Sequence, residues 1–124
     1  MRIGVLLRGE GGAARGAAYE KLAPELGMEV HTVCPERAGD PLLQAALCYR
    51  MLQLDYDAVV VYPENGTNLA GRIRGAAVHR TVLDVGPGTD PGLLDGVPGY
   101  RPLRIEGIPT LAEEVRLVLN ALSA

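Results

Sequence analysis

The glycine-rich turn near the start of the chain holds the residues best suited to chemistry. An apolar run over residues 3–7 is followed by RGEGG at residues 8–12, and Gly9, Gly11 and Ala14 fit the pattern G-x-G-x-x-A. Glycines let a backbone approach a phosphate closely, and the N-terminus of the following helix offers unpaired N–H groups. An arginine can add a charge-assisted hydrogen bond. The pattern predicts a phosphate-binding turn formed by Arg8, Gly9, Glu10, Gly11, Gly12 and Arg15.

An ordinary tight turn is the alternative, because Glu10 would repel a phosphate. Glu36 ends the second apolar run, at the place where dinucleotide-binding enzymes carry an acidic residue that binds ribose. A polar turn at residues 63–68 is a third candidate, in which Thr67 or Asn68 can bind a ligand or cap a helix. The candidate ligand contacts from this turn are Asn65, Gly66, Thr67 and Asn68.

The sequence gives little support for a metal site or for nucleophilic catalysis. Cys34 and Cys48 have no paired metal-ligand spacing, and we expect two reduced, partly buried thiols. His31 and His79 lie in a predicted strand and near a predicted helix end, and Ser123 is terminal. These residues form no evident set of nucleophile, base and orienting group. The sequence therefore predicts no catalytic residue, no metal site and no cofactor.

Composition limits the classes of partner. The 124 residues carry a net charge of −3, without the basic stripe that general nucleic-acid binding needs. Arg72, Arg74 and Arg80 are expected to form the solvated face of a helix. No apolar run is long enough to span a bilayer, and no signal pattern begins the chain. We expect a single cytoplasmic domain over residues 1–124.

Apolar runs and helical spacings alternate along the chain. Strands are expected over residues 2–7, 29–34, 58–62 and 81–85, with a fifth at 101–105. Helices are expected over 13–26, 41–54 and 69–80, and from Thr110 onward, with a long surface loop at 86–99. This alternation predicts an α/β fold of three layers, in which helices cover both faces of a mostly parallel sheet of four or five strands, flavodoxin-like or resolvase-like. Ligands of such folds bind beyond the carboxyl ends of the strands.

Local signals mark several helix ends. Pro24 should distort the end of the first helix and Gly27 should stop it, while Asp40 followed by proline starts the second. Helical spacing places Leu26 and Leu54 on core-facing lines. Thr110 with Glu113 forms a capping box, and the apolar line of this last helix docks it onto the sheet or onto another subunit.

The N-terminal part of the chain resembles the catalytic domain of serine site-specific recombinases, the resolvase and invertase group. That family's first strand ends in a Y-x-R-x-S pattern, for which this chain has Leu6-Leu7-Arg8-Gly9-Glu10. Gly27 and the following strand, the sequence ERAG at residues 36–39, and DAVVV at 57–61 have similar spacing. The resemblance extends to about Val85.

The departures from this family bear on function. Arg8 matches the arginine that helps to hold the scissile phosphate, but Glu10 occupies the position of the serine nucleophile. The arginine-containing motif after the third strand is replaced by residues 65–69. A carboxylate cannot replace a serine that must form a phosphoester with DNA, and the lost arginines would stabilise the transition state. The resemblance implies a non-catalytic, resolvase-like domain that acts through protein–protein contacts, including a homodimer.

A second resemblance favours a different function. Nucleotide-binding Rossmann-like proteins of the lysine-decarboxylase-like superfamily carry P-G-G-x-G-T after a strand, and this chain has Pro63-Glu64-Asn65-Gly66-Thr67. The double glycine that grips phosphate is lacking. The alternative function is therefore a small protein that binds a nucleotide or another phosphate ligand through residues 8–15.

Overall fold

The computed structural model describes residues 1–64, 69–86, 94 and 96–123. Five strands form one sheet in the order β2-β1-β3-β4-β5, and every neighbouring pair is parallel. The strands are β1 (Arg2–Leu6), β2 (Glu29–Val33), β3 (Ala58–Val61), β4 (Thr81–Val85) and β5 (Tyr100–Leu103). This order is the flavodoxin-like type, in which the crossover direction reverses beside β1.

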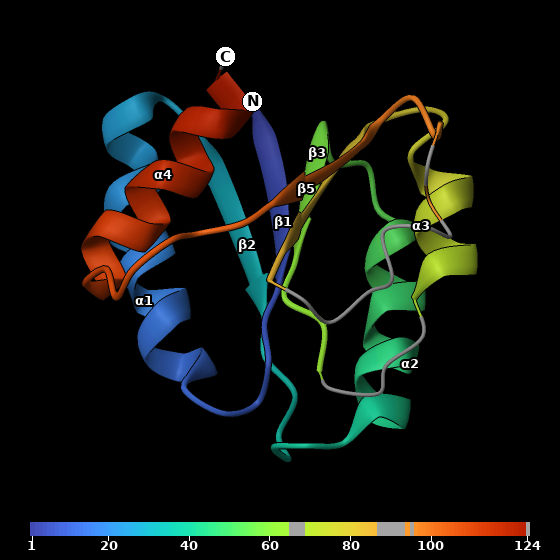
Figure 1. The fold of residues 1–124 in the computed structure, drawn as a ribbon, viewed down its shortest axis with the longest axis horizontal. Helices are drawn as coiled ribbons and strands as arrows, with labels where there is room; N and C mark the ends of the chain where they lie inside the picture. The colour runs from blue at the N-terminus through green and yellow to red at the C-terminus, as the bar shows by residue number, and fades with distance from the viewer. Residues whose placement is uncertain (65–68, 87–93, 95, 124) are drawn as a thin grey trace.

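Helices cover both faces of the sheet, as the alternation of elements predicted. Figure 1 shows α1 (Gly12–Leu22) and α4 (Leu111–Ser123) on one face, and α2 (Pro41–Leu52) and α3 (Ala70–Ala76) on the other. A separate apolar core fills each interface. Val5, Val60 and Val118 belong to the α1–α4 side, whereas Val59, Val61 and Ile73 belong to the α2–α3 side. Strands buried on both faces need apolar residues at successive positions, which explains the unbroken AVVV of β3.

The predicted helix boundaries are confirmed where a cap fixes them. The Asp40 carboxylate accepts a hydrogen bond from Leu43 N–H at 3.0 Å and caps α2. Thr110 and Glu113 exchange the two reciprocal hydrogen bonds of a capping box, 3.1 and 3.2 Å long. Gly27 ends the first helical segment with φ of 70°. The caps at Asp40 and Thr110 therefore begin their helices, and Gly27 ends the first one, as the sequence predicted.

Two predicted core residues are exposed instead. The segment Ala23–Leu26, which contains Pro24, is a 3₁₀ helix, and its tighter winding rotates Leu26 away from the core. Helix α2 ends at Leu52, so helical spacing does not extend to Leu54, which lies half-exposed. Cys48 is buried, but Cys34 is exposed rather than partly buried.

Helix α3 is shorter than predicted, and a distant part of the chain packs closely against the turn that follows it. The expected helix over residues 69–80 is helical only over Ala70–Ala76. A Cβ atom on Gly99 would collide with the carbonyl oxygens of Ala77 and Arg80. Of the loop expected over residues 86–99, Leu94 is buried against the α2–α3 core, whereas residues 87–93 and 95 lie outside the described residues.

Candidate functional site

The carboxyl edge of the sheet beside β1 is the candidate site. Because β1 lies between β2 and β3, the segments that follow these three strands meet at one edge. They contain residues 7–12, residues 34–40 and the start of the polar turn at Pro63 and Glu64. The interpretation of Asn65, Gly66, Thr67 and Asn68 as ligand contacts lies outside the described residues.

A carboxylate of the protein itself binds the glycine-rich turn. The backbone N–H of Gly9 donates a hydrogen bond to Oε1 of Glu64 at 2.8 Å, and Glu64 is only 5% exposed. The Gly12 N–H donates a hydrogen bond to the Gly9 carbonyl at 3.4 Å, and Gly11 adopts φ of 70° as the N-cap of α1. Glu10 lies exposed at the tip of the turn. Gly11 is thus required by its positive φ, and the N–H groups of Gly9 and Gly12 are already hydrogen-bonded.

The turn also packs directly against the segment after β2. A Cβ atom on Gly9 would lie 2.7 Å from the Ala38 Cα, and one on Gly12 would collide with the Cys34 sulfur. The glycines therefore allow two loops of the protein to approach each other, which is a structural use of the small residue. Glu36 is exposed on this same segment.

Gln44 of α2 joins the ends of β1 and β3. Its side-chain N–H₂ donates to the carbonyls of Leu7 and Tyr62 at 3.1 and 2.7 Å. Its carbonyl oxygen accepts from Glu64 N–H at 2.7 Å. The residue has no exposed surface. A buried amide with three partners fixes the position of the Glu64 backbone, and through it the turn at Gly9.

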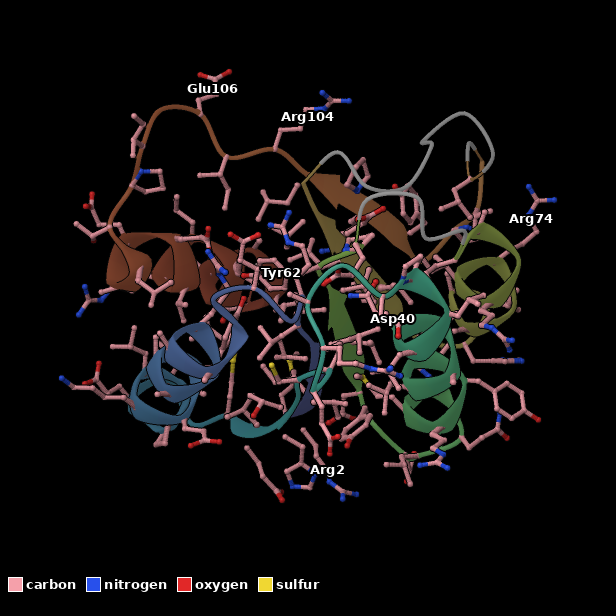
Figure 2. The ribbon with its side chains drawn as sticks, turned by 90° about the horizontal axis from the view of Figure 1, so that it is seen from below. Arg2, Asp40, Tyr62, Arg74, Arg104 and Glu106 are labelled. Atoms are coloured by element: carbon pink, nitrogen blue, oxygen red, sulfur yellow. The ribbon has the colours of Figure 1, made fainter. Side chains whose placement is uncertain are left out.

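A chain of polar side chains lies behind the turn, between α1, β3 and α4. Arg15 Nε donates to Oε2 of Glu114 at 2.6 Å, and the Tyr62 hydroxyl donates to the same oxygen at 3.3 Å. The hydroxyls of Tyr19 and Tyr62 are 2.6 Å apart. Because Tyr62 gives its one proton to Glu114, Tyr19 is the donor in this last contact. Figure 2 shows Tyr62 in the interior of the molecule.

Burial and charge perturb the titration of this chain. Burial raises the pKa of Tyr19 and of Tyr62 well above the ordinary value of 10.0, and the Glu114 charge adds to both shifts. Burial opposes the charge on Arg15, but the hydrogen bond and the charge of Glu114 outweigh it, so the Arg15 pKa is raised. The stable state has neutral tyrosines and a charged Arg15.

Arg8 differs from Arg15 in its surroundings. Its guanidinium carbon lies 5.9 Å from the centre of the Tyr62 ring, whereas that of Arg15 lies 5.3 Å from the same ring. Arg8 is half-buried, and no carboxylate among the described residues pairs with it. It is the cation of this edge that remains available to an external anion.

Sequence reasoning identified the edge but missed most side chains that organise it. Arg8, Gly9, Gly11, Gly12 and Arg15 do lie together, and Glu10 and Glu36 are exposed beside them. The missed residues are Gln44, Tyr19, Tyr62, Glu64 and Glu114. A signal was present at Gln44, a polar residue within an apolar helix, whereas the partners of Glu114 are distant in sequence.

The described residues contain no group of three or more His, Cys, Asp or Glu side chains placed to hold a metal ion. None of their helices has the length and apolar character needed to cross a membrane. Comparison with models of known protein families gives no match, and comparison with curated proteins likewise finds none.

Proposed function

We propose that this chain is a non-catalytic, resolvase-like domain that acts through protein–protein contacts. The observation that supports this most is the hydrogen bond from Gly9 N–H to the buried Glu64 carboxylate. A phosphate at this turn would have to displace a carboxylate of like charge and leave it buried without its partner. The turn thus has an internal structural role.

The charges around this edge support the same proposal. Glu10 stands where the resemblance places a serine nucleophile, and its carboxylate cannot form the phosphoester of recombination. Arg15 is held by Glu114 at 2.6 Å and would have to break that contact to reach a phosphate. Glu64 and Glu10 add negative charge to the edge, which disfavours the approach of a polyanion such as DNA.

An exposed apolar surface beside α4 supports contact with another protein. The Ile108 side chain is fully exposed, and Leu117 on α4 is half-exposed. Both line a hollow of about 520 Å³ together with Glu106, Glu113 and Arg116. Exposed apolar side chains set among charged ones are typical of an interaction site. This surface is our candidate for contacts of the C-terminal helix, including contacts with a second copy.

A DNA assay tests the non-catalytic part of the proposal. The purified protein is incubated with supercoiled DNA that carries recombination sites, and the products are separated under denaturing conditions. We expect neither nicked DNA nor a covalent protein–DNA adduct, with an active serine recombinase as the positive control. An adduct that disappears in a Glu10→Ala variant would overturn the proposal.

A phosphate-binding function is the second candidate, and the availability of Arg8 favours it. In this case a nucleotide or another phosphate ligand would contact the Arg8 guanidinium above Tyr62 and the N-terminal end of α1. A thermal-shift screen of nucleotides tests it, because a ligand at a hundred times its Kd adds about 2.7 kcal/mol of stability. A shift present in the wild type and absent in Arg8→Ala would support this function. No shift with any nucleotide would exclude a nucleotide ligand.

A further inference from the structure

A groove between α2 and α3 is separate from the carboxyl edge just described. Its volume is about 420 Å³, and its apolar part includes Tyr49, Leu52 and Ala76. Gly71 and Gly75 occupy one face of α3, and a Cβ atom added to either would meet nothing within 4 Å. The backbone of α3 is therefore bare along the groove, and another chain can approach it closely.

The groove is positively charged. Arg72 and Arg80 line it, and none of its lining residues is acidic. The Arg72 guanidinium lies 4.9 Å from the centre of the Tyr49 ring, which is itself half-exposed. The sequences of α2 and α3 contain no Asp or Glu, although the whole chain has a net charge of −3. An occupant should therefore combine exposed apolar side chains with carboxylates.

A segment of the same chain has this chemistry. Within residues 106–117, Ile108 and Leu117 are exposed, and Glu106 and Glu113 flank them. Arg116 is the one cation that lines this surface. The segment includes the first half of α4 (Leu111–Ser123), which covers the opposite face of the sheet from the groove (Figure 1). Figure 2 shows Glu106 and Arg74 of α3 pointing outward at well-separated places. The two surfaces cannot meet within one molecule.

We propose that the α2–α3 groove binds residues 106–117 of a second copy of this chain, with Ile108 seated against Tyr49 and the bare face of α3. Glu106 and Glu113 then face Arg72 and Arg80 across the contact. This proposal rests on the proposed function in protein contacts and identifies the partner. Because the two surfaces differ, the contact is head-to-tail, and it leaves a groove and a segment free at the two ends of every pair.

Two variants that each block one surface test this arrangement. Gly75→Leu fills the groove from a position with open space, and Ile108→Lys places a cation on the segment. Sedimentation velocity of the wild type should show oligomers that grow with concentration, while each variant alone stays monomeric. An equimolar mixture of the two variants should form a dimer and nothing larger, since each supplies the surface that the other lacks.

Charge reversal provides a second, milder variant of the groove. We expect Arg72→Glu to raise the Kd of association about tenfold, as reversing a charge at an interface does. Lys21→Glu on α1 is the matched control, because it also reverses a positive charge but at a residue that lines neither surface, and it should leave the Kd unchanged. Circular dichroism confirms that each variant is folded before its association is measured.

Contrary outcomes have distinct meanings. A wild type that remains monomeric at every concentration would overturn the head-to-tail proposal, while the non-catalytic part of the proposed function is tested separately by the DNA assay. Association that Ile108→Lys abolishes and Gly75→Leu leaves intact would mean a symmetric contact through α4, and would also overturn it. So would a mixture of the variants that forms no dimer.

Discussion

Arg15 and Glu114 are 99 residues apart in sequence, yet the Arg15 Nε lies 2.6 Å from a carboxylate oxygen of Glu114. The pair joins the first turn of α1 to the first turn of α4, and both side chains are largely buried, with 20% and 16% of their surface exposed. The Glu114 carboxylate also accepts a hydrogen bond from the Tyr62 hydroxyl, so α1, α4 and the end of β3 meet at this one group.

The Glu114→Ala variant should be destabilised, because it leaves Arg15 partly buried without its anion. We expect the free energy of unfolding to fall by about 2–4 kcal/mol in a urea titration. Arg37→Ala is the control, since Arg37 is exposed and its pair with Asp40 should contribute less than about 0.5 kcal/mol. Equal losses in the two variants would show that the buried position of Glu114 gives its ion pair no extra value.

Gln44 should be the residue of α2 most sensitive to loss of polarity. Gln44→Met conserves the shape of the side chain but leaves two carbonyls and the Glu64 N–H without partners in the interior. The expected loss of stability is about 2–4 kcal/mol. Gln53→Met makes the same change at an exposed position and should alter stability by less than about 0.5 kcal/mol. A stable Gln44→Met protein would contradict the bridging role.

Stability should fall in alkali because of Tyr19 and Tyr62. Their pKa values in the folded protein are raised above 10.0, so the stabilisation from these groups is complete below pH 10 and is lost as the pH rises further. Each contributes a slope of about 1.4 kcal/mol per pH unit in that range. Urea titrations at several alkaline pH values should give a shallower slope for Tyr19→Phe than for the wild type. An unchanged slope in Tyr19→Phe would contradict this role of the buried Tyr19 hydroxyl.

The close approach at Gly9 gives a further prediction. Gly9→Ala places a methyl group against the Ala38 backbone, and we expect a loss of about 1–3 kcal/mol in unfolding free energy. Gly71→Ala, in open space on α3, should instead gain about 0.5–1 kcal/mol from its better helix propensity. Thermal unfolding of both variants measures the contrast. If Gly9→Ala were as stable as Gly71→Ala, the packing of the two loops would not limit residue 9 to glycine.

The elements with local signals could be predicted from the sequence, and those decided by packing could not. The apolar run of β3, the Asp40 cap and the Thr110 capping box each depend on a few neighbouring residues, so the sequence alone predicts them. The turn after α3 packs against Gly99, which is distant in sequence. The exposure of Leu26 depends on a change from α to 3₁₀ winding, which rotates a residue by a fraction of a turn.

The same distinction applies to the candidate site. The glycine-rich turn could be predicted because an arginine and several glycines directly follow an apolar run. Glu64, the residue that binds this turn, could not be predicted, because it lies in a polar turn after a strand and belongs to no helical or strand periodicity. Tyr62 fits equally well as one more apolar residue of β3. Only the parallel order of β1 and β3 brings Glu64 to Gly9.

The amide of Gly9 in the glycine-rich turn binds the protein's own Glu64, and an NMR titration with inorganic phosphate tests this assignment most directly. The backbone amide of Gly9 should be protected from exchange by its hydrogen bond to Glu64, and the amides of residues 9–12 should not shift as phosphate is added. Saturable shifts confined to these amides, accompanied by loss of the protection at Gly9, would contradict the claim and favour a phosphate site.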